Sequence, residues 1–339
     1  MQSQRGRKPP QQQLAHIGEH GLLDHLRRWF AKDSQGFELG IGDDAAALAL
    51  PKQGAPLVVS TDTLIEGVHF CFDWTGPRDL GHKALAVNLS DLAAMAARPV
   101  AAFLALSLPP ETRMDALREF FLGLRTEGRR HGCPLIGGDL TRAPQWCVTL
   151  TVLGQPATAV PVLRSSARPG DRLFVTGWPG RSGAGRAALA AGATAPSLVR
   201  AHVRPLPRLD EAVALASTCS RLAMMDVSDG LWHDADQLAR ASGVRVEIDR
   251  GALKPTPPMR RLAAQLGADP LHWMLFGGED YELLFAADPS EATFGNVLSR
   301  AGLRTAVTCI GRIRHGEGIA LVDDSGRSID LSDTTFRHF

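Results

Sequence analysis

KALAVNLSDLAAMAARP, residues 83–99, is an apolar stretch that holds a single acid, Asp91. Small and aliphatic residues recur in it at helical spacing, so the pattern predicts a helix over 78–97 that Pro99 ends. Asp91 is the only charged residue between positions 84 and 97. Because an unpaired charge is costly inside a protein, this carboxylate must either face a cavity at the edge of the helix or be paired.

On both sides of this helix, predicted strands alternate with predicted helices. Strands are expected at 57–59, 101–108, 147–153, 172–176, 244–248 and 307–313, and GGEDYELLFA (277–286) is expected to form a turn and a strand. Helices are expected at 14–32, 111–131, 183–192, 208–223, 230–241 and 288–301. The Pro-, Ala- and Ser-rich stretch 154–171 is the best candidate for a domain boundary. The fold class predicted is α/β or α+β, with a disordered tail at 1–13 and domains at 14–155 and 156–339.

Length and charge exclude several classes of protein. The 339 residues suggest two domains at roughly 150 residues each. With 37 Lys+Arg against 36 Asp+Glu there is no basic footprint for nucleic acid. No apolar run reaches the ~20 residues that a membrane span needs, and the start does not resemble a secretory signal. The five cysteines are odd in number and form no CxxC pair, which predicts a reducing, cytoplasmic location.

The familiar catalytic signatures are missing, but acids recur in unusual settings. We find no GxxxxGK[ST], HRD, DFG, GxSxG or HExxH. Instead, carboxylates stand in glycine turns, at predicted strand ends and on apolar helices. They are Asp43, Asp44, Asp62, Asp91, Asp139, Asp226, Asp229, Glu279 and Asp280.

Converging carboxylates need cations. Two such charges ~4 Å apart repel by about 4 kcal/mol at an effective dielectric of ~20, so a cluster must either take up protons or bind metal. Carboxylate and hydroxyl oxygens suit Mg²⁺, which completes its shell with water and substrate phosphates. Ser60, Thr61 and Asp62 supply three adjacent oxygens at a strand end. The pattern therefore indicates a magnesium–phosphate site.

Each of these residues also has a simpler structural explanation when it is taken alone. Asp44 after a glycine is typical of a turn, and Ser228-Asp229-Gly230 is typical of a helix cap. Glu279 fits a glycine turn, and His69 fits a partly buried histidine. The number of acids in glycine-framed segments is what favours a functional site.

The segments together resemble the thiamine-monophosphate kinase family. The matching stretches run in order over about residues 17–286 and are GIGDDAAAL, STDTLIEGVHF, KALAVNLSDLAAMAARP, LIGGDLTR, PGDRLFVTG, MDVSDGL and GGEDYELLF. The family belongs to the superfamily of aminoimidazole ribonucleotide synthetase and selenophosphate synthetase. The resemblance implies a two-domain ATP-binding fold, and a homodimer in which N-terminal strands form a barrel between subunits.

The resemblance also implies an activity and a set of site residues. The activity is transfer of the ATP γ-phosphoryl group to thiamine monophosphate, giving thiamine diphosphate, with several Mg²⁺ ions. Positions that match metal ligands are Asp44, Ser60, Thr61, Asp62, Asp91, Asp139, Asp226 and Asp229. Positions that match ATP contacts are Gly138, Asp139, Arg164 and Ser228. Positions that match thiamine contacts are His69, Glu279 and Phe336, the last in a C-terminal FRHF that departs from the usual ending of the family.

The implied chemistry agrees with the residues, because a dianionic phosphate acceptor needs no general base. Alternatives within the superfamily fit less well. Selenophosphate synthetase would need a reactive cysteine near the N-terminus, and a carbamoyl-dehydrating maturation factor would need a cysteine at the C-terminus. The stretches STDTLIEGVHF and GGEDYEL are a poor match for aminoimidazole ribonucleotide synthetase. A non-catalytic Mg-nucleotide binding module is the alternative from another class of function, and ATP binding without turnover would identify it.

Overall fold

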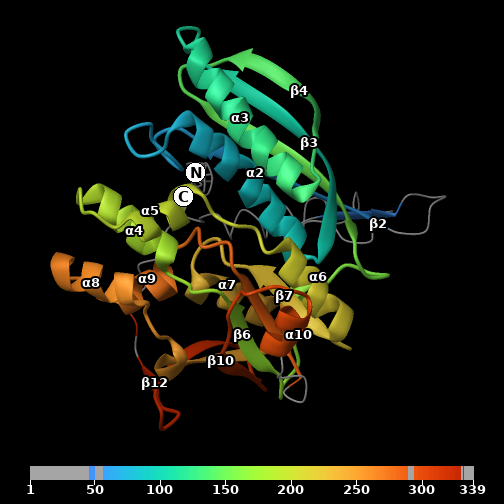
Figure 1. Ribbon diagram of the computed structural model, residues 1–339. Coiled ribbons are helices and arrows are strands. Elements are labelled where there is room, and N and C mark those ends of the chain that lie inside the picture. The colour runs from blue at the N-terminus through green and yellow to red at the C-terminus, as the bar shows by residue number, and fades with distance from the viewer. Residues whose placement is uncertain (1–45, 50–55, 289–293, 330, 332–339) are drawn as a thin grey trace, which may run out of the picture.

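The computed structural model describes residues 46–49, 56–288, 294–329 and 331. The first half of this part of the chain builds a five-stranded sheet, shown in the upper part of Figure 1. Its strands, in spatial order, are β1 (Ala46–Ala49), β2 (Pro56–Ile65), β5 (Cys147–Pro156), β3 (Ala97–Leu108) and β4 (Leu135–Arg142). Neighbouring strands run antiparallel except β3 and β4, which are parallel.

The second half builds a seven-stranded mixed sheet. Its strands, in spatial order, are β12 (Ser328–Ile329), β11 (Gly318–Val322), β8 (Arg245–Asp249), β10 (Val307–Arg314), β6 (Arg172–Thr176), β9 (Leu283–Ala287) and β7 (Leu222–Asp226). Only the β11–β8 ladder is parallel. Strands β6, β7 and β9 are almost wholly apolar and buried on both faces, which explains why they are short and continuous in the sequence.

Helix α2 (Pro77–Ala94) is the most deeply buried helix of the described chain and lies beside α3 (Met114–His131) in Figure 1. Thirteen of its 18 residues are buried, so it is apolar on nearly every side. Glycines let the two helices touch backbone to backbone. A Cβ on Gly81 would stand 1.9 Å from the Phe120 carbonyl oxygen, and one on Gly123 would stand 2.0 Å from that of Arg78.

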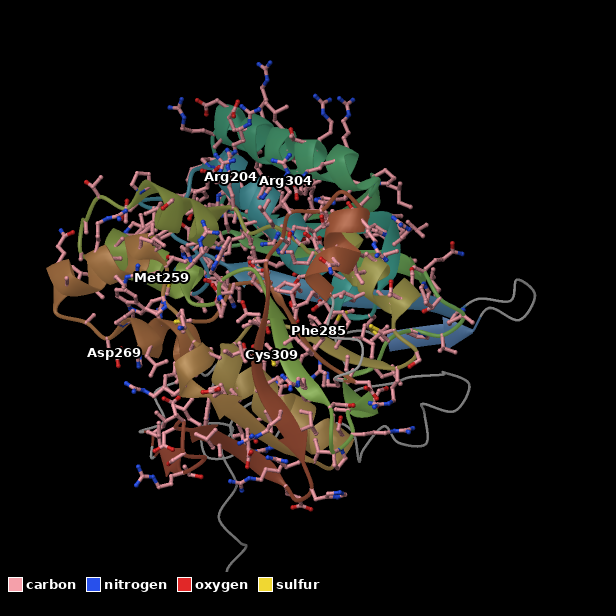
Figure 2. All side chains as sticks on the ribbon, turned by 60° about the horizontal axis from the view of Figure 1, so that its bottom comes forward. Arg204, Met259, Asp269, Phe285, Arg304 and Cys309 are labelled. Atoms are coloured by element: carbon pink, nitrogen blue, oxygen red, sulfur yellow. The ribbon has the colours of Figure 1, made fainter. Side chains whose placement is uncertain are left out.

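Two hydrophobic cores flank the second sheet. One joins α2, α3 and the first sheet to α6 (Leu209–Thr218), α10 (Phe294–Arg300) and Phe285 of β9. The other holds Met259 and lies under the remaining helices, which are α4 (Arg181–Ala190), α5 (Pro196–Val203), α7 (Leu231–Ser242), α8 (Pro257–Leu266) and α9 (Pro270–Phe276). Figure 2 labels Phe285 and Met259 within these cores. Because α2 packs against both sheets, it is the element that can carry side chains into a site between them.

Most predicted elements are present, and the mixed α/β fold is confirmed, but several boundaries were wrong. The helix over 78–97 ends at Ala94, and Pro99 lies inside β3 next to a register shift between Pro99 and Ala101, where a proline disturbs no ladder bond. The helix expected at 208–223 ends at Thr218, because 222–226 forms β7. The helix expected at 288–301 covers only Phe294–Arg300 among the described residues.

Some helices and strands of the structure have no counterpart among the elements predicted from the sequence. Helices α5, α8 and α9 and strands β11 and β12 were not predicted. Two short 3-10 helices, Arg164–Ser166 and Arg250–Ala252, complete the described chain. The helix predicted at 14–32 and the tail at 1–13 lie outside the described residues. The barrel between subunits and the domain limits stay predictions.

None of the helices in the described ranges is long and apolar enough to cross a membrane.

Candidate active site

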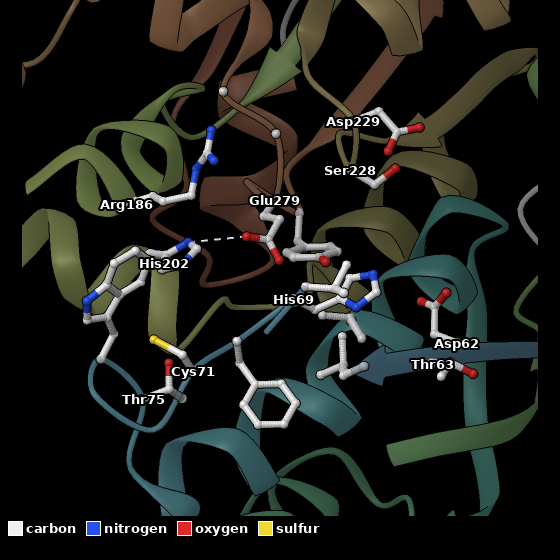
Figure 3. A pocket seen from close by; sticks show the side chains of 18 of the residues that line it. Asp62, Thr63, His69, Cys71, Thr75, Arg186, His202, Ser228, Asp229 and Glu279 are labelled. Atoms are coloured by element: carbon white, nitrogen blue, oxygen red, sulfur yellow. Dashed lines mark ion pairs between the residues drawn. The ribbon is translucent and has the colours of Figure 1, made fainter. Parts of the chain in front are cut away.

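A cavity of about 420 Å³ opens between the two halves of the chain (Figure 3). Its walls come from β2, the loop from β2 to α2, α2 itself, helices α4 and α5, and the loops that follow β7 and precede β9. Segments more than two hundred residues apart in sequence therefore share one space. In Figure 3, Asp62 and Asp229 lie on one side of the view and His202 lies on the other, with Glu279 next to His202 and His69 between Glu279 and Asp62.

The acidic end brings together four of the predicted metal ligands. Asp62 lies on β2, Asp91 on α2, Asp226 at the end of β7 and Asp229 in the loop that follows. Strand geometry decides which oxygens of β2 take part, because successive side chains point to opposite faces. Ser60 and Asp62 point towards α2, whereas Thr61 lies on the exposed face, where its hydroxyl donates to the Leu150 carbonyl at 3.0 Å.

Helix α2 holds these acids through hydrogen bonds. The Ser60 hydroxyl donates to Asp91, and the Asp62 backbone N–H donates to the Asn88 side chain at 3.0 Å. Ser90 donates to Asp226 at 2.7 Å across the boundary between the two halves. Helix α2 therefore ties the acids of both sheets to one rigid element.

Burial and repulsion between carboxylates both affect the charge at this end of the cavity. Burial raises the pKa of Asp226 to about 6 against the hydrogen bond from Ser90, and the charges of Asp62 and Asp229 raise it further. Arg164 acts in the opposite direction on this pKa. The arrangement is that of a site made for cations.

The donor set fits magnesium. Among the described residues, no three His, Cys, Asp or Glu side chains come close enough to form a ready-made metal site. An open set of carboxylates is nevertheless what Mg²⁺ uses when water and substrate phosphates fill the rest of its octahedral shell.

Glu279 is held in the loop between α9 and β9 by backbone contacts with the Ser228 loop. Its N–H donates to the Ser228 carbonyl at 2.6 Å, and the Tyr281 N–H donates to the Val227 carbonyl at 2.8 Å. Glu279 and Tyr281 both adopt positive φ angles, 56° and 51°, which side chains other than glycine rarely adopt. Such strain is characteristic of functional loops.

The Glu279 carboxylate has a partner on each oxygen. Lys83 of α2 lies 2.7 Å from Oε1, and Nδ1 of His202 on α5 lies 3.3 Å from Oε2. Burial alone would raise the pKa of Glu279, but Lys83 and His202 outweigh it and lower this pKa below its ordinary value. Burial, helped by Lys83, lowers the pKa of His202 to about 4, so at neutral pH a neutral imidazole lies against Glu279.

His69 lies in the loop that leads from β2 to α2. Its Nδ1 accepts a hydrogen bond from the Ile65 N–H at 3.0 Å, so in the neutral imidazole the proton is on Nε2. Lys83 donates to the His69 carbonyl oxygen at 3.4 Å. The two residues proposed to contact thiamine, His69 and Glu279, are thus both linked to one lysine.

The structure does not bring every predicted residue to this cavity. Gly138 and Asp139 were expected in a glycine turn, but they lie on the exposed edge strand β4, where the parallel ladder with β3 continues through the two glycines. Arg164 is 7% exposed rather than solvated, donates to Gln237 at 2.7 Å and is not among the residues that line the cavity. Asp43, Asp44 and Phe336 lie outside the described residues.

Asp280, which stood in the acidic set, has a structural role. Its carboxylate accepts from the backbone N–H groups of Gly180 at 2.5 Å and Ser182 at 3.0 Å, at the N-terminus of α4. Burial raises its pKa to about 7, and these two amides only partly offset that rise. It therefore fixes α4 against the Glu279 loop and does not face the other acids.

Sequence reasoning missed several residues of the site: Lys83, Asn88, Ser90, Arg186, His202 and Tyr281. A signal existed for three of them. Lys83, Asn88 and Ser90 are polar residues inside or next to the apolar stretch that already marked Asp91. No comparable local signal marks His202 or Arg186, because both lie on short amphipathic helices of ordinary composition.

Comparison with known families accounts for most of the chain. Residues 42–155 match the family model of the AIR synthase related protein, N-terminal domain, and residues 168–324 match that of its C-terminal domain. A thiamine-monophosphate kinase of Mycobacterium tuberculosis is 38% identical over 312 residues, which cover 91% of this chain and 89% of the relative. One from Salmonella typhimurium is 39% identical, covering 89% of this chain and 92% of the relative.

Solved structures agree with these sequence matches. A structure of AaThiL complexed with AMPPCP and TMP matches 98% of this chain and 100% of that one, with a TM-score of 0.84 and 30% identity. Thiamine-monophosphate kinase from Stenotrophomonas maltophilia matches 91% of this chain and 96% of its own, with a TM-score of 0.74 and 36% identity. The hydrogenase maturation protein HypE of E. coli shares the fold alone, at 21% identity and a TM-score of 0.71. The chain thus belongs to the thiamine-monophosphate kinase family, within the AIR synthase related proteins.

Proposed function

We propose that this protein transfers the γ-phosphoryl group of ATP to thiamine monophosphate, giving thiamine diphosphate and ADP. The observation that carries the proposal is that the acids and the pair His69 and Glu279 line one and the same cavity. Membership of the family supports the same activity. So does the solved relative with AMPPCP and TMP, whose structure resembles this chain over nearly its whole length.

The two ends of the cavity divide the substrates between them. Phosphate groups belong at the end with Asp62, Asp91, Asp226 and Asp229, where only cations could neutralise both the carboxylates and the phosphates. The thiamine moiety belongs at the other end, where the Glu279 carboxylate accepts hydrogen bonds and His69 Nε2–H donates one. We propose that the acceptor phosphate points from the thiamine end towards the acids.

Asp62, Asp91, Asp226 and Asp229 would hold magnesium, together with Asp44 and the oxygens of Ser60, Thr61 and Asp139 as further candidates. Bound Mg²⁺ would offset the repulsion between two polyanions and the charge that develops on the transferred group. The protein contributes the rigid placement of the carboxylates, through Ser60, Asn88 and Ser90.

The chain needs no general base for this reaction. The acceptor is a phosphate monoester with a second pKa near ~6, so it is largely dianionic at neutral pH and already nucleophilic. What remains is in-line alignment of acceptor and donor, which lowers a large part of the activation barrier in reactions of this kind.

We further propose that Gly138, Arg164 and Ser228 contact ATP, that Phe336 contacts thiamine, and that the protein is a cytoplasmic homodimer.

A direct assay tests the proposal. Purified protein is incubated with ATP, Mg²⁺ and thiamine monophosphate, and thiamine diphosphate is measured by chromatography. Asp62→Ala should abolish turnover with an unchanged circular dichroism spectrum, whereas Asp236→Ala on α7, which does not line the cavity, should not. Absence of product with folded, ATP-binding protein would favour a nucleotide-binding module instead. Light scattering reports the oligomeric state.

A further inference from the structure

We propose that Lys83 is the positioning residue for the thiamine end of the cavity, holding both the Glu279 carboxylate and the His69 backbone in their working places. The inference rests on the function proposed above and adds to it a residue that no substrate-binding assignment includes. Lys83 would act before the substrate binds, by orienting the groups that contact it.

The contacts of Lys83 are all with this end of the cavity. Its ammonium lies 2.7 Å from Oε1 of Glu279 and donates to the His69 carbonyl oxygen at 3.4 Å. Glu279 comes from the second half of the chain and His69 from the first, so one cation links the two walls that enclose the ligand. Each contact is charge-assisted, which makes it stronger than an ordinary hydrogen bond.

Burial separates the role of Lys83 from that of its partner. The Lys83 side chain is 1% exposed, whereas that of Glu279 is 26% exposed. The ammonium is therefore sealed behind the carboxylate and cannot reach a ligand itself, while the carboxylate remains open to the cavity. Any effect of Lys83 on substrate binding must pass through the groups that it holds.

The ion pair between Lys83 and Glu279 helps to fix the orientation of the Glu279 carboxylate. Glu279 has a φ of 56°, which restricts the directions its side chain can take, and His202 holds the second carboxylate oxygen from α5. Lys83 of α2 holds the first carboxylate oxygen. The carboxylate is thus clamped between two helices, in an orientation that is set before a ligand arrives.

Lys83 also keeps Glu279 in the ionised form. Without the ammonium, a carboxyl at this depth would keep only the imidazoles of His202 and His69 as its ionisable neighbours, so burial would favour its protonated form. A protonated carboxyl offers one donor and loses acceptor capacity, and it would recognise N–H groups of a ligand less well. Removal of Lys83 should therefore weaken thiamine monophosphate binding without touching the phosphate end.

The test uses Lys83→Met, Glu279→Gln and the double variant, with Arg204→Met as the matched control. Arg204 pairs with Asp79 and joins the same two helices one turn away, but neither residue lines the cavity. Lys83→Met should raise KM for thiamine monophosphate about tenfold, with KM for ATP and kcat changed less than about twofold. In the Glu279→Gln background the same change should add little, because the lysine acts through that carboxylate.

The pH dependence of KM for thiamine monophosphate distinguishes this positioning role from a purely structural role, which would not change that dependence. From pH 8 to pH 6, KM for thiamine monophosphate should rise more in Lys83→Met than in the unaltered protein, whose own profile reflects the acceptor phosphate and Asp226. Lys83→Gln keeps a donor without the charge and serves as the second variant if the methionine protein does not fold. Arg204→Met should lower stability alone.

Three results would overturn the inference: an unchanged KM in a folded Lys83 variant, an equal rise in KM for ATP, or full additivity with Glu279→Gln. Failure of the proposed function has a different signature, because the unaltered protein itself would then give no thiamine diphosphate. In that case the inference falls with the function on which it rests.

Discussion

Ser90 on α2 donates a hydrogen bond of 2.7 Å to Asp226 at the end of β7, although 136 residues separate them. Ser90 is fully buried and Asp226 nearly so. The bond joins the two halves of the chain at the acidic end of the cavity. It also lowers the pKa of Asp226, against the larger effect of burial. One hydroxyl therefore serves both the packing of the two sheets and the charge state of the site.

Removal of that hydroxyl should destabilise the fold. Ser90→Ala leaves a buried carboxyl group without this donor, so the free energy of unfolding should fall by about 1–3 kcal/mol. Urea denaturation at pH 7 measures the change. Ser217→Ala, which removes an exposed hydroxyl bonded to the Val213 carbonyl, is the control and should change stability by less than about 0.5 kcal/mol. Equal effects of both changes would refute the role given to Ser90.

Asp226 should destabilise the metal-free protein at high pH. Its pKa in the folded state is about 6, above its value of 3.8 in the unfolded chain. Folding therefore favours the protonated form, and the stability present below pH 3.8 is lost as the pH rises through 6. Asp226→Asn should be more stable than the unaltered protein at pH 8 without metal, by about 1–3 kcal/mol, and no more stable at pH 4. Denaturation at both pH values in EDTA tests this.

Magnesium binding should compete with protons at the same group. Below pH 6 a proton must leave Asp226 before a cation can bind, so affinity should fall by up to about tenfold per pH unit. Calorimetric titration with MgCl₂ at pH 5.5 and pH 8 would measure this, with KCl at matched ionic strength as control. Asp226→Asn should bind weakly at both values. Identical affinity at both pH values in the unaltered protein would contradict the assignment.

A buried cluster away from the cavity should govern stability in acid. Glu127 on α3 lies 2.9 Å from His82 and 2.9 Å from His131, and these histidines outweigh burial and lower its pKa to about 2. The depressed pKa contributes stability above pH 4.5 that is lost as the pH falls towards 2, up to about 3 kcal/mol. Glu127→Gln should flatten this dependence in urea titrations between pH 5 and 3. Glu119→Gln, at an exposed position of the same helix, should leave it intact.

The pair of Arg221 and Asp171 should be structural only. Its two hydrogen bonds, of 2.5 and 2.6 Å, hold a buried carboxylate at the start of β6. Arg221→Met leaves that carboxylate without its cation, so stability should fall by about 3 kcal/mol. Arg240→Met removes an exposed pair with Asp236 and should have little effect. Steady-state kinetics should give unchanged KM values for both variants, and a raised KM in either would show an unforeseen link to the site.

Local patterns in the sequence were enough for the helix around Asp91 and for a strand leading to Asp62, although that strand continues to Ile65. These features depend on side-chain periodicity, which acts over a few residues. The same patterns misplaced Pro99 and Gly138, because pairing with neighbouring strands overrode the local preference for an end or a turn.

The partners of each side chain were decided by the tertiary structure. Nothing near Lys83 in the sequence points to Glu279, 196 positions later, and nothing near Ser90 points to Asp226. The alternation of β2 separates Thr61 from Asp62 only once α2 covers one face of the sheet. The residues of this protein specify which groups could do chemistry. Which of them meet depends on how two sheets close around one buried helix, because contacts between distant segments form only when the whole chain packs.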